Sequence, residues 1–393
     1  MGNRLRITTE EGEYCFLSAF QSEKYKDVEV VVGNKYEIEI LEPITNDIEW
    51  ITDEPKMPEV ICKARLKNYD KGEVTFEWEY WVSYEINRVN WPNLDDVCTR
   101  TGKIKFKGTS TSFNSQITTW LVEFKRSSCE VAYLKARDYK TNQDCEKTIY
   151  QWNEGEDVFI GGNVYIQVIA KNPSGRILGL KTLDNLKILG TNPDDITVLT
   201  GIDDKLKAVI YEETMHTYDQ FNRKDINKNY PNIRFLAGSI FNKKGFPQYG
   251  PPNGIGLGQI DNPAATELQL WNWKANRERS EELLNGYFTS ASSYVWRIRN
   301  NKYLRGEKYL YTYKDENNVE FRIGYHNATD LSEDDILKDA FQRYNTGRPQ
   351  QKWVPDDPTK TDSPGHWQRI NNIEYGNRVF GFYSKIKNGN YYP

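Results

Sequence analysis

The sequence predicts a protein of two parts, an N-terminal all-β region followed by a mainly helical C-terminal region. Hydrophobic residues alternate with polar ones in much of the first half, which is typical of strands, whereas later segments repeat hydrophobic residues at helical spacing. A polar loop at 190–195 separates the two patterns and contains Asp and Thr residues that could cap a helix. We therefore predict domains at 1–190 and 191–393.

The clearest strand of the first region is the segment 73–86. Its hydrophobic residues face one side, and glutamates such as Glu77 face the other. Turn signals, among them Gly33-Asn34, separate the strand candidates. Several short strands separated by turns are typical of an antiparallel sandwich of the immunoglobulin type, built as one sandwich or as two small β modules. The other expected strands are 28–32, 36–40, 60–66, 103–107, 117–124, 158–170 and 177–189.

The second region is dominated by helical patterns. The segment 206–221 is expected to be one helix, because Leu206, Val209 and Ile210 repeat at helical spacing. The other elements expected in this region are helices at 264–273, 276–299 and 336–344, and a hairpin that joins 309–313 to 320–324.

The composition argues against several classes of protein. The net charge is −4 with acidic and basic residues interspersed, so no basic patch for nucleic acid is expected. No run of 18 or more apolar residues is present, so no membrane span is expected. The first residues lack the apolar core of a secretory signal. A removed leader, another export route and a protein that stays inside the cell all stay open.

Glu213 is the candidate acid because it continues the hydrophobic row of Leu206, Val209 and Ile210. Its neighbour Glu212 lies about 100° away on the helical wheel and is expected to reach water. Burying a carboxyl group without a cationic partner favours its protonated form. A carboxylic acid that stays protonated near neutral pH can donate a proton to a glycosidic oxygen, so the chain is a candidate for cleaving sugar polymers.

Two further motifs follow Glu213-Thr214 in the sequence. Residues 254–259 read Gly-Ile-Gly-Leu-Gly-Gln, and residues 344–347 read Tyr-Asn-Thr-Gly at a predicted helix end. In this order the three motifs resemble those of the lysozyme-like soluble lytic transglycosylases and their goose-type lysozyme relatives. The resemblance covers roughly residues 195–350 and depends on the combination of motifs. It implies that the C-terminal half is a mainly α, lysozyme-like domain.

The resemblance also implies roles for individual residues. Glu213 would protonate the glycosidic oxygen of peptidoglycan and then act as the base. Tyr344 would orient the reacting carboxyl group or the sugar, and Asn345 would support the groove wall. The residues of the glycine loop that would line the groove and hold the sugar are Gly256, Leu257 and Gln259.

Three alternatives for the function stay open. In the lytic enzymes the ionised glutamate takes the proton of the muramic acid 6-hydroxyl, which closes an anhydro ring without a second carboxylate. A hydrolase of the lysozyme or chitinase type normally needs a second carboxylate. Asp261, directly after the glycine loop, is the candidate for that role, although a turn or cap is its more common use. The third alternative is a non-catalytic cell-wall-binding or particle structural protein.

The expected partner is the glycan strand of peptidoglycan, which would place the protein in the periplasm, in the cell envelope or outside the cell. The N-terminal β region would then bind the wall, a phage-tail protein or a secretion-particle protein. The chain has 3 His residues, and none stands in a metal-binding motif, so neither a metal nor another cofactor is expected.

Overall fold

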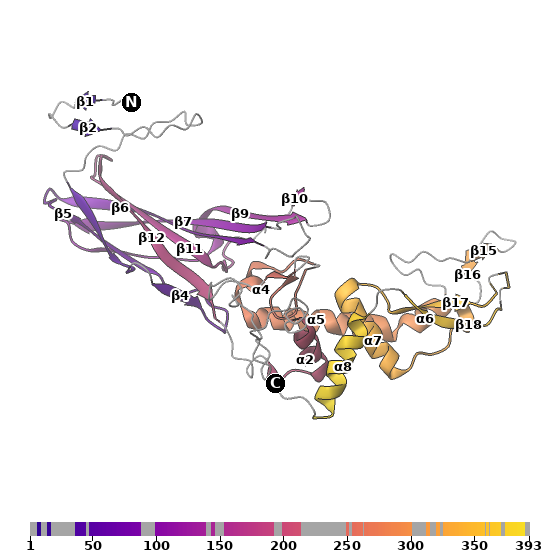
Figure 1. Cartoon of the computed structure of the whole chain (residues 1–393). Helices are drawn as coiled ribbons and strands as arrows, with labels where there is room; N and C mark the ends of the chain where they lie inside the picture. Colours follow the sequence, from indigo (N-terminus) through magenta and orange to yellow (C-terminus); the bar gives the residue numbers. More distant parts are fainter. Residues whose placement is uncertain are drawn as a thin grey trace, which may run out of the picture.

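A computed structural model gives the fold of the chain (Figure 1). The N-terminal half is built mainly from two β-sheets, and the C-terminal half from helices with short hairpins. The residues that the structure describes are 6–8, 14–16, 36–44, 47–87, 99–138, 143–145, 153–191, 199–213, 249–250, 254–261, 263–300, 312–314, 320–322, 325–357, 359–360, 362–370 and 374–389.

The larger sheet has seven described strands, with β6 at its centre. Neighbouring strands run antiparallel except β12 and β4, which are parallel. The alternating sequence of β6 buries one face of the sheet, because Phe76, Trp78 and Tyr80 are at most 1% exposed. The strands in spatial order are β10 (Gln143–Cys145), β9 (Cys129–Asp138), β7 (Thr99–Phe113), β6 (Glu73–Asn87), β11 (Gly162–Lys171), β12 (Ile177–Gly190) and β4 (Ile48–Ile51).

A three-stranded sheet packs against the buried face of the larger one. Cys62, Ala64 and Leu66 of its middle strand belong to the same core as the buried residues of β6. The rings of Trp78 and Trp120 stack between the two sheets, with their centroids 6.0 Å apart. The strands of this sheet are β3 (Glu37–Glu42), β5 (Ile61–Lys67) and β8 (Thr118–Leu121), while β1 (Arg6–Thr8) and β2 (Tyr14–Phe16) pair separately.

The helices of the C-terminal half build a second core. Leu206 of α2, Phe341 of α7 and Val379 of α8 meet there with residues of α5, and Figure 1 shows these helices grouped around α5. None of the described helices combines the length and the apolar character needed to cross a membrane. The helices are α2 (Asp204–Tyr211), α4 (Glu267–Trp271), α5 (Trp273–Ser292), α6 (Tyr294–Arg299), α7 (Glu333–Thr346) and α8 (Tyr375–Lys387).

Three hairpins of short strands accompany the helices in the described part of this half. The longest packs on α6 through a third, aromatic core that contains Tyr294, Tyr325 and Trp353. The paired strands are β13 (Tyr249–Gly250) with β14 (Gly254–Ile255), β15 (Thr312–Lys314) with β16 (Glu320–Arg322), and β17 (Gln351–Pro355) with β18 (Gly365–Arg369).

The sheets and the helices share buried residues where they meet. Trp271 of α4 is fully buried in the core of the two sheets. The hydroxyl of Tyr84 in β6 donates to Oε1 of Glu267 at 2.7 Å, and the indole of Trp271 donates to Oε2 of the same carboxylate at 3.3 Å. The indole of Trp273 donates to Oδ1 of Asp53 at 2.9 Å. These contacts anchor α4 and α5 to the sheets.

The fold class predicted from the sequence is wrong. We expected an all-β, immunoglobulin-like sandwich followed by a mainly α, lysozyme-like domain. The described residues instead combine strands and helices. Hairpins accompany the helices of the C-terminal half, and the large sheet of the N-terminal half contains a parallel pair of strands. The physical reason is burial, because the apolar side of α4 is covered by the sheets rather than by other helices. The boundary near residue 190 stays a prediction.

Individual elements were easier to predict than their assembly. The strand predicted at 73–86 is β6, the helix predicted at 336–344 is α7, and the hairpin predicted around 309–324 is formed by β15 and β16. The strand predicted at 28–32 lies outside the described residues, as does the part of the predicted 206–221 helix beyond residue 213. The elements without a counterpart in the prediction include β4, β9, β17, β18 and α8.

Candidate active site

Glu213 lies just beyond the C-terminal end of α2. The helix begins after Asp203, whose side chain accepts a hydrogen bond of 2.7 Å from the backbone N–H of Lys205. Leu206 and Ile210 bury the apolar face of the helix. Residues 212–213 continue the helix in a wider, π-type turn. This turn carries Glu213 towards α8, the helix that packs beside α2.

The carboxyl group of Glu213 lies in surroundings that favour its protonated form. Burial raises the pKa of Glu213 from its ordinary value of 4.5 to about 8. The hydroxyl of Tyr375 donates to Oε1 of Glu213 at 2.5 Å and opposes this shift in pKa, as does Arg378. The negative charges of Glu212 and Asp261 add to it. The residue as a whole keeps part of its surface exposed, although its carboxyl group is buried.

Glu212 does not reach water, which corrects the expectation from the helical wheel. It is only 3% exposed, and its Oε1 accepts a hydrogen bond of 2.6 Å from Nε of Arg378. The π-type turn and the packing of α8 over this end of α2 bring both glutamates inside. Arg378 supplies the positive charge that a buried carboxylate needs. Glu212 therefore forms an ion pair, whereas Glu213 accepts a hydrogen bond from a neutral phenol.

The glycine loop is a tight turn packed against α5. Ile255 and Ile260 exchange backbone hydrogen bonds of 3.2 and 3.0 Å across it. Gly256 has a φ of +77°, and a Cβ at this position would lie 2.3 Å from the side chain of Asn276. Asn276 is fully buried, donates to the Ile255 carbonyl at 3.1 Å and accepts from the Gly258 N–H at 3.3 Å. This asparagine therefore holds the loop against the helix.

Two of the three loop residues predicted to bind sugar, Gly256 and Leu257, are buried. Leu257 is fully buried in the helical core. Gln259 has a φ of +47°, and its side-chain amide donates to the carbonyl of Gly256 at 2.8 Å. Gly256 itself is buried, while Gln259 keeps part of its surface exposed. Of the predicted ligands in this loop, only Gln259 presents a side chain to solvent.

Tyr344 connects the glycine loop to α7. Its hydroxyl donates to the carbonyl of Gly258 at 2.8 Å. Burial raises the pKa of Tyr344 far above its ordinary value, a hydrogen bond to Ser280 opposes this shift, and the charges of Glu213 and Asp261 add to it. Tyr344 is therefore a neutral phenol at physiological pH, and its pKa responds to both carboxyl groups of the candidate site.

The remaining predicted residues lie at the surface. Asp261 is exposed directly after the loop, and its charge acts on both Glu213 and Tyr344. Asn345 is exposed near the end of α7, which Gly347 closes with a φ of +67°, as the Tyr-Asn-Thr-Gly motif predicts. The structure thus brings Glu213, Tyr344 and Asp261 together and places Asn345 on the solvent side of α7. Thr214 lies outside the described residues.

Sequence reasoning missed four residues of the site. Tyr375 and Arg378 come from α8, where the spacing of Tyr375 and Val379 was a signal for a helix but not for its contact with Glu213. Asn276 and Ser280 are fully buried polar residues one turn apart in α5. Asn276, Ser280 and the buried Leu284 lie four residues apart on one face of α5. Small polar residues on such a face could have indicated that the backbone of another segment packs closely against this helix.

Two conservative substitutions should move the pKa of Glu213 in opposite directions. Tyr375→Phe removes a hydrogen bond that favours the ionised carboxylate, so the pKa should rise above about 8. Asp261→Asn removes a neighbouring negative charge, so the pKa should fall. The measurement is an NMR titration of the Glu213 side-chain carboxyl carbon in the full chain. A shift of both variants in the same direction would contradict the surroundings described here.

No protein-family model matches the chain, and no curated protein is significantly similar to it. Among the described residues, no group of three or more His, Cys, Asp or Glu side chains is arranged to hold a metal ion. The surroundings of Glu213 and the three sequence motifs are therefore the basis for a functional proposal.

Proposed function

We propose that this protein cleaves the β-1,4 bond between MurNAc and GlcNAc in peptidoglycan, with Glu213 as general acid and base. The observation that supports this most is the carboxyl group of Glu213, whose pKa burial raises to about 8. A protonated acid at neutral pH is what the first step of glycan cleavage requires. The order of the three motifs, which resembles that of the soluble lytic transglycosylases, is the second support.

In the lytic reaction, Glu213 would give its proton to the glycosidic oxygen while the bond from that oxygen to C1 of MurNAc breaks. The resulting carboxylate would take the proton of the 6-hydroxyl group as its oxygen bonds to C1 and closes the anhydro ring. The atoms balance without water, so one carboxyl group is sufficient. Tyr375 favours the ionised form of Glu213, which exists between the two proton transfers, and is therefore a positioning residue.

Tyr344 and the glycine loop would form the wall beside the acid. Because the Tyr344 hydroxyl already donates to the Gly258 carbonyl, Tyr344 would act by fixing the loop rather than by binding the sugar directly. Gln259, which keeps part of its surface exposed, would be the side chain of the loop that contacts the sugar. Leu257 would contribute only through packing, since it is fully buried.

Hydrolysis of the same bond is the second candidate, and the position of Asp261 is the observation that favours it. Asp261 is exposed, and its charge acts on Glu213. In a hydrolytic reaction Asp261 would take a proton from a water molecule as the water oxygen bonds to C1, and a reducing end would result. A purely structural or cell-wall-binding role is the outcome if neither product appears.

A peptidoglycan substrate would place the protein in the periplasm, in the cell envelope or outside the cell. The two sheets of the N-terminal half would then position the site, by binding the wall, a phage-tail protein or a secretion-particle protein.

The test is incubation of the full chain with purified peptidoglycan, followed by mass analysis of the released sugars. We expect anhydro-muropeptides, which are lighter than reducing products by one water molecule. Reducing ends that disappear in the Asp261→Asn variant would instead establish hydrolysis with Asp261 as the second carboxylate. Release of neither product, from protein that is folded by circular dichroism, would refute the proposed activity.

A further inference from the structure

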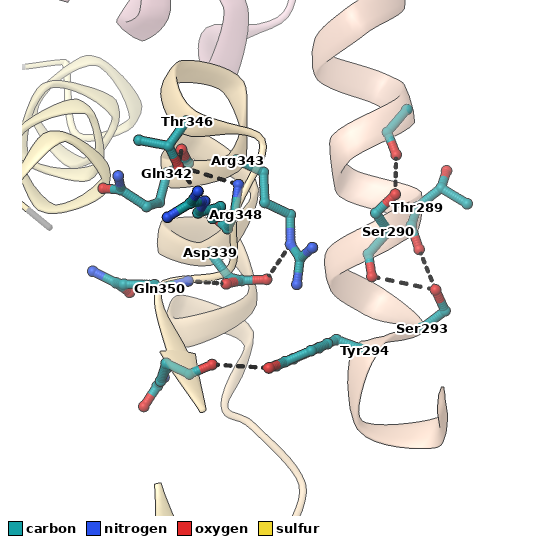
Figure 2. Close-up of polar contacts among 12 residues, drawn as sticks. Thr289, Ser290, Ser293, Tyr294, Asp339, Gln342, Arg343, Thr346, Arg348 and Gln350 are labelled. Carbon is teal, nitrogen blue, oxygen red and sulfur yellow. Dashed lines mark hydrogen bonds and ion pairs between the residues drawn. The ribbon is translucent and has the colours of Figure 1, made fainter. Parts of the chain in front are cut away.

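A buried ion pair lies on α7 beside the candidate site. Nε of Arg343 donates to Oδ2 of Asp339 at 2.7 Å, one helical turn away (Figure 2). Asp339 is fully buried, and its other oxygen accepts the backbone N–H of Gln350 at 2.5 Å. Asp339 therefore fixes both the arginine and the chain that follows α7.

The guanidinium group of Arg343 is held in place, but its donors are not all used. Figure 2 shows the Arg343 side chain between α7 and the helix end that carries Ser290 and Ser293. The guanidinium carbon lies 4.8 Å from the centroid of the Tyr294 ring, and the Tyr294 hydroxyl donates to the Gln351 carbonyl at 3.1 Å. A stacked and paired arginine of this kind is positioned before any ligand arrives.

One nitrogen of this arginine is buried without a partner. An arginine carries five N–H donors, and Nη2 of Arg343 has no hydrogen-bond partner in the part of the chain that the structure describes. Leaving a buried donor unpaired is costly, so such a group indicates a missing acceptor. The Arg343 side chain as a whole keeps 11% of its surface exposed, although Nη2 itself is buried.

Two tyrosines connect Arg343 with the candidate acid. Arg343 directly precedes Tyr344 in α7, and the rings of Tyr344 and Tyr287 meet edge to face with centroids 6.2 Å apart. Burial raises the pKa of Tyr287, the charge of Asp261 adds to the shift, and Arg343 opposes it. The aspartate that acts on Glu213 and the arginine of α7 therefore both act on the same ring.

We propose that Arg343 binds a carboxylate of the substrate through its Nη edge and thereby selects glycan strands that carry acidic groups. This inference rests on the proposed function. Asp339 occupies Nε and leaves Nη2 without an acceptor among the described residues, so the Nη side of the guanidinium group can take a second carboxylate. Peptidoglycan offers carboxylates on the lactyl group of MurNAc once stem peptides are removed, and on the stem peptides themselves. Chitin oligosaccharides have β-1,4-linked sugars of similar shape and no carboxylate.

Binding of three ligands to the full chain tests this inference. Each is measured by calorimetry in the Glu213→Gln variant, so that no ligand is consumed. The ligands are peptide-free peptidoglycan strands, strands with stem peptides, and chitin oligosaccharides of equal length. The double substitution Asp339→Asn and Arg343→Gln, which leaves no unpaired buried charge, should weaken binding of a carboxylated strand on the order of tenfold to a hundredfold. Binding of chitin should stay unchanged, and the strand that loses affinity identifies the carboxylate.

Two further variants separate recognition from structure. Arg348→Gln removes the same charge from an exposed position near the end of α7 and should leave the preference for carboxylated strands intact. Arg343→Lys keeps a cation beside Asp339 but loses the planar fork, so it should lose the preference even if the double variant does not fold.

The outcomes for the two proposals are distinct. Equal effects on charged and neutral strands, no effect on either, or no binding by any variant would overturn the assignment of Arg343. A protein that distinguishes the strands as expected but cleaves none of them in its Glu213 form would overturn the proposed function and leave carboxylate recognition standing.

Discussion

Glu213→Gln should lower the rate of glycan cleavage on the order of 10²-fold or more, because an amide of the same shape has no proton to give to the glycosidic oxygen. The amide oxygen can still accept the hydrogen bond from Tyr375, so the geometry of the site should be kept. The measurement is the release of soluble fragments from peptidoglycan at limiting substrate near neutral pH. Equal rates for the variant and the wild type would remove Glu213 from the role of acid.

The raised pKa of Glu213 also determines how the cleavage rate and the stability of the fold depend on pH. Cleavage by the wild type should fall as the pH rises through about 8, because the acid then loses its proton.

The folded chain holds this proton more tightly than the unfolded chain, whose glutamate titrates near 4.5. The resulting stabilisation is fully present below pH 4.5 and is lost as the pH rises to about 8. The Gln variant escapes this loss, so at pH 8 and above it should be no less stable than the wild type. A poorly folded variant at that pH would contradict the buried placement of the carboxyl group.

Gly256→Ala should destabilise the chain by roughly 2–5 kcal/mol, because it combines a left-handed backbone with a steric clash. Gly256 has a φ of +77°, and the added Cβ would lie 2.3 Å from Nδ2 of Asn276. Asn276 cannot move away without breaking its hydrogen bonds to Ile255 and Gly258. The measurement is the midpoint of urea unfolding, followed by tryptophan fluorescence. At temperatures where the variant is folded, its cleavage rate should also fall, since the loop beside Tyr344 is displaced.

Gly286→Ala provides the matched control for that substitution. Gly286 lies in α5 near Asn276 in sequence, but a Cβ at this position would meet nothing within 4 Å. An alanine in an exposed helical position should stabilise the chain by about 0.5–1 kcal/mol relative to glycine. A loss of stability comparable to that of Gly256→Ala would show that α5 tolerates no added methyl group and that Asn276 has no special role.

Local patterns were readable from the sequence because their causes are local. The alternation in 73–86 is a property of a strand with one buried face, and it appears as β6. The row from Leu206 to Ile210 indicated the apolar face of α2, and Gly347 indicated the end of α7. The sequence indicated a loop at 254–259 but not its packing, and the close approach of Gly256 to Asn276 explains why glycine is required there.

The surroundings of Glu213 were not readable, because they come from residues far away in the sequence. Tyr375 and Arg378 lie more than 150 positions after the glutamates that they contact. The helical wheel placed Glu212 in water because it could not include α8, which covers that side. The fold class failed for the same reason, since nothing local indicates that Trp271 packs into the core of the sheets.

The junction between the sheets and α4 has a consequence for exchanging the two halves between proteins. Trp271 inserts among sheet residues, and the carboxylate of Glu267 takes its hydrogen bond from Tyr84. If residues 191–393 were fused to a different N-terminal domain, the Trp271 indole would lose the sheet residues around it, and the Glu267 carboxylate would lose its hydrogen bond from Tyr84. Transfer of the C-terminal half to another protein is therefore expected to succeed only when the part of β6 around Tyr84 and the segment around Asp53 after β4 are transferred with it.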